Sequence, residues 1–183
     1  MQEVSLLAFP LRVKGNKVHK IVAKVFLLIL ALQLSLGARI INIDKIIDST
    51  QQENKHLLVW LHKTDCGYCE NMREFTLENE TVKAFIDDNF TFVHINVYEK
   101  DAITYQDFSG NGLEFAKEIG YNFYPSSLFF NYEGEIILSE VGFVDSDTMP
   151  NEKRFYKILN FIESKSYEKM NYSDFEFQIK EEL

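Results

Sequence analysis

The chain has 183 residues, of which 46% are hydrophobic and 26% charged. This composition suits one folded domain with short extensions and excludes an intrinsically disordered protein. The formal net charge of −9 makes an acidic surface, which repels nucleic acid and anionic membranes.

Residues 1–37 have the pattern of a secretory signal peptide. A basic stretch over 14–24 precedes an apolar run over 25–32, and small residues end the segment at Gly37. We predict cleavage after Gly37 and export to the periplasm, which leaves 14 basic and 27 acidic residues. The alternative is an uncleaved membrane anchor, although the apolar run is shorter than the roughly 20 residues of a spanning helix.

The remaining chain alternates helical and strand patterns. In chain order, the first half predicts a helix over 42–54, a buried strand over 56–62, a helix from Cys66 to about residue 75, a helix over 80–88 capped by Asn79, and a strand over 90–97. The second half predicts a polar loop over 98–111, a helix over 113–119, strands over 127–131 and 135–141 joined as a hairpin, and an amphipathic helix over 151–164.

This order predicts an α/β fold. A strand–helix–strand unit gives a parallel pair with a right-handed crossover, and the later hairpin adds antiparallel strands. We expect a central mixed four-stranded sheet with helices on both faces. It forms a single domain over 38–164, followed by an acidic C-terminal tail over 165–183 without a firm pattern.

Two cysteines, Cys66 and Cys69, are the only ones in the chain. A disulfide that closes two intervening residues constrains little of the unfolded chain, so it indicates chemistry rather than stabilisation. With Asp65 as the expected N-cap, Cys66 lies in the first helical turn, where free N–H groups and the helix dipole favour its thiolate. Cys69 then resolves the mixed disulfide. Gly67 and Tyr68 shape the turn between them.

Four features occur together in this sequence. They are Cys66-Gly67-Tyr68-Cys69 followed by Glu70-Asn71-Met72, the helix break at Asn79, the insertion with Asp107-Phe108-Ser109-Gly110, and Tyr124-Pro125 ahead of Ser126–Phe130. Together they resemble the thioredoxin superfamily over residues 56–164, and within it the periplasmic SoxW-type thioredoxin-like proteins.

The resemblance implies a thioredoxin fold and thiol–disulfide oxidoreductase activity without a cofactor. It implies a cis peptide bond at Tyr124-Pro125 facing the cysteines, where the backbone of Tyr124 can pair with a substrate strand. The catalytic residues are then Cys66 and Cys69, and Gly67, Tyr68, Tyr124 and Pro125 bind substrate. The expected partners are client proteins with thiols or disulfides and a redox partner protein, with the chain itself a monomer.

Two positions depart from the family pattern. Tyr124 stands where a threonine or small residue usually precedes the proline, so we expect its ring to lie against the disulfide and restrict which chains dock. The alternative is that it packs on neighbouring aromatics. Trp60 stands where thioredoxin has a buried acid, so proton transfer must use water or another group, with His62 and Glu70 as candidates.

Alternatives remain for function and location. The Gly67-Tyr68 pair is also found in disulfide isomerases, and a non-catalytic client-binding module could keep the same fold. The ending Lys180-Glu181-Glu182-Leu183 and the N-x-S/T sequences at Asn79, Asn89 and Asn171 would fit the endoplasmic reticulum. We expect no metal, because the histidines are explained as strand and surface residues.

Overall fold

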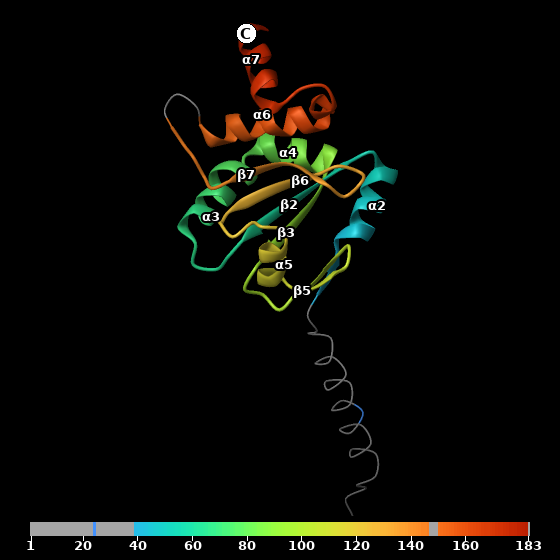
Figure 1. The fold of residues 1–183 in the computed structure, drawn as a ribbon. Helices are drawn as coiled ribbons and strands as arrows, with labels where there is room; N and C mark the ends of the chain where they lie inside the picture. The colour runs from blue at the N-terminus through green and yellow to red at the C-terminus, as the bar shows by residue number, and fades with distance from the viewer. Residues whose placement is uncertain (1–23, 25–38, 147–149, 183) are drawn as a thin grey trace, which may run out of the picture. The chain divides into compact units, whose positions relative to one another are not determined.

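The computed structural model describes residues 24, 39–146 and 150–182. It divides into two units, Met1–Gly37 and Ala38–Leu183. Apart from Lys24, the predicted signal peptide lies outside the described residues, so its cleavage and the anchor alternative stay predictions. Everything below concerns the second unit (Figure 1).

The central sheet has the order β3-β2-β6-β7. It is formed by β2 (His56–His62), β3 (Phe90–Asn96), β6 (Ser126–Phe130) and β7 (Ile136–Val141). The β2–β3 pair is parallel, whereas β6 is antiparallel to both of its neighbours. The predicted mixed four-stranded sheet is therefore confirmed, together with its hairpin.

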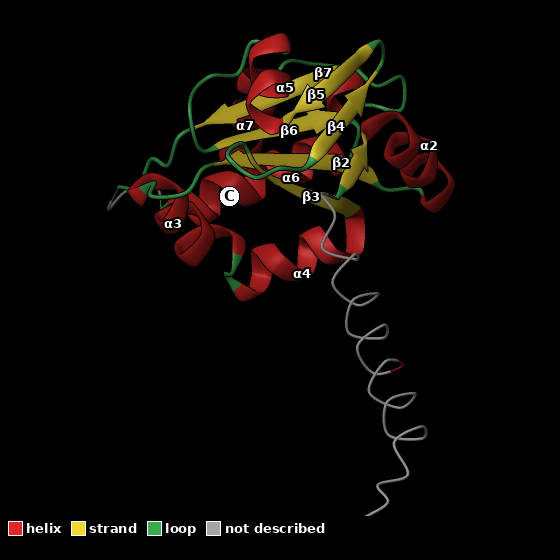
Figure 2. Cartoon of the chain, turned by 90° about the horizontal axis from the view of Figure 1, so that it is seen from below, coloured by secondary structure: helices red, strands yellow, loops and turns green. Residues whose placement is uncertain are grey.

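Helices cover both faces of this sheet (Figures 1 and 2). One face carries α3 (Gly67–Met72), the π-helical segment η1 (Arg73–Leu77), α4 (Glu80–Asn89) and α6 (Asn151–Glu163). The other face carries α2 (Ile43–Glu53) and α5 (Gly112–Glu118). None of the described helices is long and apolar enough to cross a membrane.

Alternation along β2 builds two core clusters, one on each face. Leu58 and Trp60 belong to the cluster that also contains Cys66 and Cys69, which we call the cysteine-side cluster. Leu57, Val59 and Leu61 belong to the cluster on the opposite face. All five of these β2 side chains are buried, which explains why β2 reads as an unbroken apolar run.

The prediction of a polar loop over 98–111 is wrong. It contains β4 (Ala102–Tyr105) and β5 (Phe108–Asn111), which with β1 (Ile40–Asn42) form a second sheet of order β1-β4-β5. Ile103 at its centre is fully buried in the opposite-face cluster. Strands of three or four residues are too short to show a clear alternation.

The C-terminal residues were expected to lack a firm pattern, and this expectation is also wrong. A 3₁₀ turn, η2 (Ser166–Glu168), leads into α7 (Tyr172–Glu182). Tyr172 and Phe175 lie against Phe161 of α6. Their ring centroids are 5.5 Å and 5.1 Å, respectively, from the ring centroid of Phe161. The last part of the chain is therefore packed onto the domain through aromatic side chains.

Candidate active site

The two cysteines lie where β2 passes into α3. They form a disulfide with Cα atoms 5.2 Å apart. The N-cap of α3 is Cys66 and not Asp65 as predicted. Asp65 has a φ of 55°, in the left-handed region that turns the chain just before the helix.

Cys66 Sγ accepts the backbone N–H of Cys69 at 3.2 Å. This N–H is one of the helix-start donors that have no carbonyl partner within the helix. A donor at this position favours a negative charge on the Cys66 sulfur, so we expect it to stabilise a thiolate once the disulfide is reduced. The corrected cap therefore strengthens the predicted role of Cys66, because its own side chain caps the helix.

Both cysteines are buried. Cys66 is 8% exposed and Cys69 is 2% exposed, so Cys66 is the more accessible of the two, as predicted, but only narrowly. Access to Cys66 runs through a pocket of about 440 Å³, which we call the redox pocket. Its lining residues are His62, Lys63, Thr64, Asp65, Cys66, Gly67, Glu70 and Asn96.

The Tyr124-Pro125 peptide bond is cis, as the resemblance implied. The carbonyl oxygen of Tyr124 lies 3.9 Å from Cys66 Sγ. Because the sulfur is in a disulfide and carries no proton, this is a contact and not a hydrogen bond. Pro125 is tied to the chain after β7, since its carbonyl accepts the N–H of Gly142 at 2.7 Å.

Gly67 and Tyr68, between the cysteines, lie at the surface. A Cβ atom added at Gly67 would meet no atom within 4 Å, and Tyr68 is 65% exposed. Phe123, just before the cis peptide bond, is 74% exposed. Apolar surface is thus available beside the disulfide, but substrate binding by these residues stays a prediction.

Trp60 and His62 form a stacked pair on β2. Their ring centroids are 4.3 Å apart with an angle of 15° between the planes. Trp60 Nε1 and His62 Nε2 are both buried without a hydrogen-bond partner among the described residues. Burial is the main reason that the pKa of His62 is lowered, and His94 adds to the effect.

Glu70, the other predicted candidate for proton transfer, is held differently. Its Oε2 accepts bonds from Arg73 Nε at 3.2 Å and from Arg73 NH2 at 2.8 Å. The pKa of the Arg73 guanidinium is raised, first by its hydrogen bonds to Glu70 and Glu78. The Glu70 carboxylate is therefore already engaged as an ion-pair acceptor.

A buried polar link that the sequence did not reveal involves Asn151, which is 3% exposed. Its Nδ2 donates to Thr76 Oγ1 at 2.7 Å and lies 3.3 Å from Met72 Sδ. Its Oδ1 accepts the N–H of Val144 at 3.3 Å. Asn151 thus joins the active-site helix to the segment after β7. The only signal in the sequence was an asparagine behind Pro150 at the start of an amphipathic helix.

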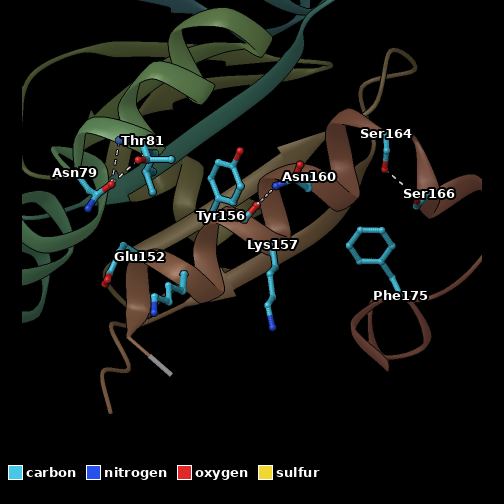
Figure 3. A pocket seen from close by; sticks show the side chains of 11 residues that line it. Asn79, Thr81, Glu152, Tyr156, Lys157, Asn160, Ser164, Ser166 and Phe175 are labelled. Atoms are coloured by element: carbon cyan, nitrogen blue, oxygen red, sulfur yellow. Dashed lines mark hydrogen bonds between the residues drawn. The ribbon is translucent and has the colours of Figure 1, made fainter. Parts of the chain in front are cut away.

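A larger pocket, about 750 Å³, lies away from the cysteines between α4 and α6 (Figure 3). Asn79 and Thr81 border it at the start of α4, Tyr156 and Asn160 rise from α6, and Phe175 of α7 lies at its other end. It shares no lining residue with the redox pocket. Among the described residues, no group of three or more histidine, cysteine or carboxylate side chains could hold a metal ion.

Two solved structures are similar to the chain, and the first of them supports the fold. A thioredoxin-fold protein from Helicobacter pylori is 17% identical, with 70% of this chain and 81% of that chain covered and a TM-score of 0.54. A thioredoxin from Thermus thermophilus is 20% identical, with 69% and 88% covered and a TM-score of 0.49. No curated protein sequence matches the chain.

A family model described as a thioredoxin-like domain matches residues 43–157, which is more than half of the chain. The match includes the cysteine pair and the cis Tyr124-Pro125 bond. The finer resemblance to SoxW-type proteins stays a prediction. On the fold and the family match, the chain belongs to the thioredoxin-like domain family.

Proposed function

We propose that this chain is an exported thiol–disulfide oxidoreductase that reduces protein disulfides by exchange at Cys66 and Cys69. The observation that carries the proposal is the setting of Cys66 Sγ. It accepts a helix-start N–H at 3.2 Å and lies 3.9 Å from the carbonyl oxygen that precedes Pro125. One side of the sulfur thus stabilises a thiolate, and the other offers backbone to a client strand.

The exchange has two steps. The Cys66 thiolate attacks a client disulfide, so a bond forms between Cys66 Sγ and one client sulfur while the client disulfide breaks and its other sulfur leaves. Cys69 then attacks Cys66 Sγ, which restores the internal disulfide and releases the second client sulfur. Two electrons pass from the cysteine pair to the client, and a dithiol redox partner must supply them again.

We propose the reducing direction. In the redox pocket, Asp65 opposes a thiolate at Cys66 and so favours an electron donor, whereas Lys63 and the helix-start N–H act in the other direction, and Glu70 is paired with Arg73. The reduction potential measures the balance of these charges.

The test is a pair of measurements on the purified chain without residues 1–37. The reduced protein should reduce the disulfides of a model protein, and Cys66→Ser should abolish this activity. Its reduction potential should lie near about −270 mV, as for thioredoxin; a value near about −120 mV would make it an oxidant instead. Cys69→Ala should trap a mixed disulfide with a client, whereas Cys66→Ala should not.

Export to the periplasm is part of the proposal and has its own test. Mass spectrometry of protein from its native host should find an N-terminus near Ala38. An intact N-terminus in a membrane fraction would favour the anchor. A C-terminal retrieval role for Lys180-Glu181-Glu182-Leu183 would instead place the chain in the endoplasmic reticulum.

One observation favours a second candidate, a disulfide isomerase. The residues between the cysteines, Gly67 and Tyr68, are the pair found in such enzymes, and both are accessible at the surface. An isomerase would restore activity to a protein with scrambled disulfides at catalytic amounts. A reductant would reduce that protein without restoring its activity.

A further inference from the structure

His62 shares the redox pocket with Cys66. It is the last residue of β2 and lines the pocket together with the cysteine. The same imidazole also lines a second pocket of about 400 Å³, where Trp60 and His94 are its neighbours. The stacking on Trp60 fixes the plane of the ring, so the imidazole is held at the boundary between the two pockets.

The imidazole is in a state that can accept a proton. Burial and the neighbouring His94 lower its pKa, so the ring is neutral at pH 7. A neutral imidazole has one nitrogen that donates and one that accepts. Nε2 is buried without a hydrogen-bond partner among the described residues, Cys66 included, so no described group already occupies it and a proton from Cys66 must reach the ring through water in the redox pocket.

The charged and titratable groups around His62 come from several elements. In the redox pocket they are Lys63, Asp65, Cys66 and Glu70, and in the second pocket they are Arg73, Glu78, Lys83, Asp87 and His94. Glu99, in the loop after β3, also acts on the ring and, like Glu70, raises its pKa. These acids stabilise an imidazolium once it forms, although burial outweighs them while the cysteines are oxidised.

The other acceptors in the redox pocket are less suited to take the thiol proton. Glu70 Oε2 is occupied by Arg73, and the Asp65 side chain belongs to an exposed residue. A carboxylate is also a weaker base than an imidazole, with an ordinary pKa of about 4 compared with about 6.5. Trp60, at the position of the usual buried acid, has no proton to exchange in this range.

We propose that His62 is the proton-transfer residue of the Cys66 exchange, an inference that rests on the proposed function. In the reduced protein, the Cys66 thiol gives its proton to the imidazole through a water molecule in the redox pocket that both side chains line. The resulting thiolate attacks the client disulfide, and the client sulfur that leaves takes a proton from the imidazolium by the same route. The proton therefore ends on the client thiol, and His62 is neutral again.

This role has a signature that packing alone does not produce. A thiolate next to the ring favours its charged form, so the His62 titration midpoint should be higher in the reduced protein than in the oxidised protein, by about one pH unit or more. NMR titration of the imidazole signals in both states measures this directly. His56 is the internal control, because it does not line the redox pocket and should shift much less.

The kinetic test is the rate of Cys66 alkylation as a function of pH in the reduced protein. In His62→Gln the midpoint of this profile should move up by about one pH unit, because the thiolate loses its charged partner. His62→Phe keeps a ring to stack on Trp60 and should show the same shift. His94→Gln should leave the midpoint within a few tenths of a unit.

Two results would overturn the assignment: equal His62 midpoints in the oxidised and reduced protein, or an unchanged alkylation profile in both His62 variants. A purely structural role would lower the rate by the same factor at every pH. Failure of the proposed function looks different, because then the wild-type chain itself would not reduce a protein disulfide.

Discussion

The carbonyl oxygen of Tyr124 lies 3.9 Å from Cys66 Sγ, whereas the Tyr124 hydroxyl is buried with no hydrogen-bond partner among the described residues. The backbone of this residue faces the disulfide. Its ring packs against the cysteine-side cluster and also against the opposite-face cluster. The structure thus places Tyr124 in contact with both core clusters, which goes beyond packing on neighbouring aromatics alone.

Tyr124→Phe should be neutral or stabilising by up to about 1 kcal/mol, because it removes a buried hydroxyl that makes no hydrogen bond. Burial also raises the pKa of this phenol, in keeping with its desolvated position. Urea unfolding of the oxidised protein measures the difference. A loss of more than about 1 kcal/mol would mean that the hydroxyl has a partner in solution.

Tyr124→Thr, the residue type usual in the family, should lower stability by about 2 kcal/mol, because part of a packed ring is lost. It should also change the relative rates with a peptide disulfide and a bulky protein disulfide, since the ring lies beside the docking backbone. Rates with both substrates that are unchanged from wild type, together with an unchanged reduction potential, would show that Tyr124 is only structural.

Asn151→Ala should lower the free energy of unfolding by about 1–3 kcal/mol. The substitution leaves the Thr76 hydroxyl fully buried without the partner that it has in the wild-type protein, whereas the N–H of the exposed Val144 can bond to water. Asn160→Ala on the same helix is the matched control, because Asn160 only donates to the carbonyl of Tyr156. Equal losses for both variants would contradict a special role for Asn151.

The fold could be predicted from sequence where hydrophobic residues follow a regular pattern over a whole strand or helix. The unbroken run over 56–62 must be buried on both faces, and the alternation over 90–97 marks its parallel neighbour. Asn79 was readable as a cap, and its Oδ1 accepts the N–H groups of Thr81 and Val82. These signals are local, so the sequence alone carries them.

The missed elements depend on partners that are distant in sequence. β1 and β4 are three and four residues long and pair with each other across 62 residues of sequence, and β4 also pairs with β5. Just before the two strands, the side chains of Arg39 and Asp101 form an ion pair. α7 had a readable signal, since Asn171 accepts the N–H of Asp174 as a cap, but its aromatic contacts depend on α6.

In the candidate active site, too, some features follow from local sequence and others depend on residues that are distant in the chain. The cysteine pair was readable from its spacing and the cis proline from the family resemblance, but the cap at Cys66 depends on the left-handed turn at Asp65, which the residue type did not indicate. His62 was a candidate from its place in the chain alone. Its stacking on Trp60 and its share of the redox pocket could be known only from the fold.

Phe175→Ala should lower the free energy of unfolding by about 1–3 kcal/mol, because the ring packs on Phe161 at 5.1 Å and lies at the end of the larger pocket. Phe177→Ala is the matched control on the same helix. Its side chain belongs to a residue that is 62% exposed, so its removal should change stability by no more than about 0.5 kcal/mol. Chemical denaturation measures the free energy of unfolding of both variants. A Phe175→Ala protein as stable as wild type would show that α7 is not docked in solution.

His56 should make the stability of the domain depend on pH between about 4 and 6.5. It is 3% exposed, stacks on Tyr132 with centroids 5.2 Å apart, and its Nε2 lies 3.1 Å from the Tyr167 hydroxyl. Burial first, and the nearby Lys165 second, lower its pKa from 6.5 to about 4. The unfolded chain therefore binds a proton at pH 5 that the folded chain does not, and stability is lost as the pH falls from about 6.5 towards about 4.

From pH 7 to pH 5 this linkage should cost about 2 kcal/mol. In His56→Gln the side chain can still bond the Tyr167 hydroxyl but does not titrate, so the variant should be less stable at pH 7 yet lose about 2 kcal/mol less between pH 7 and pH 5. Urea unfolding of wild type and variant at both pH values measures the two differences. If His56→Gln and wild type lose the same free energy over this interval, burial does not lower the pKa of His56 in the folded protein.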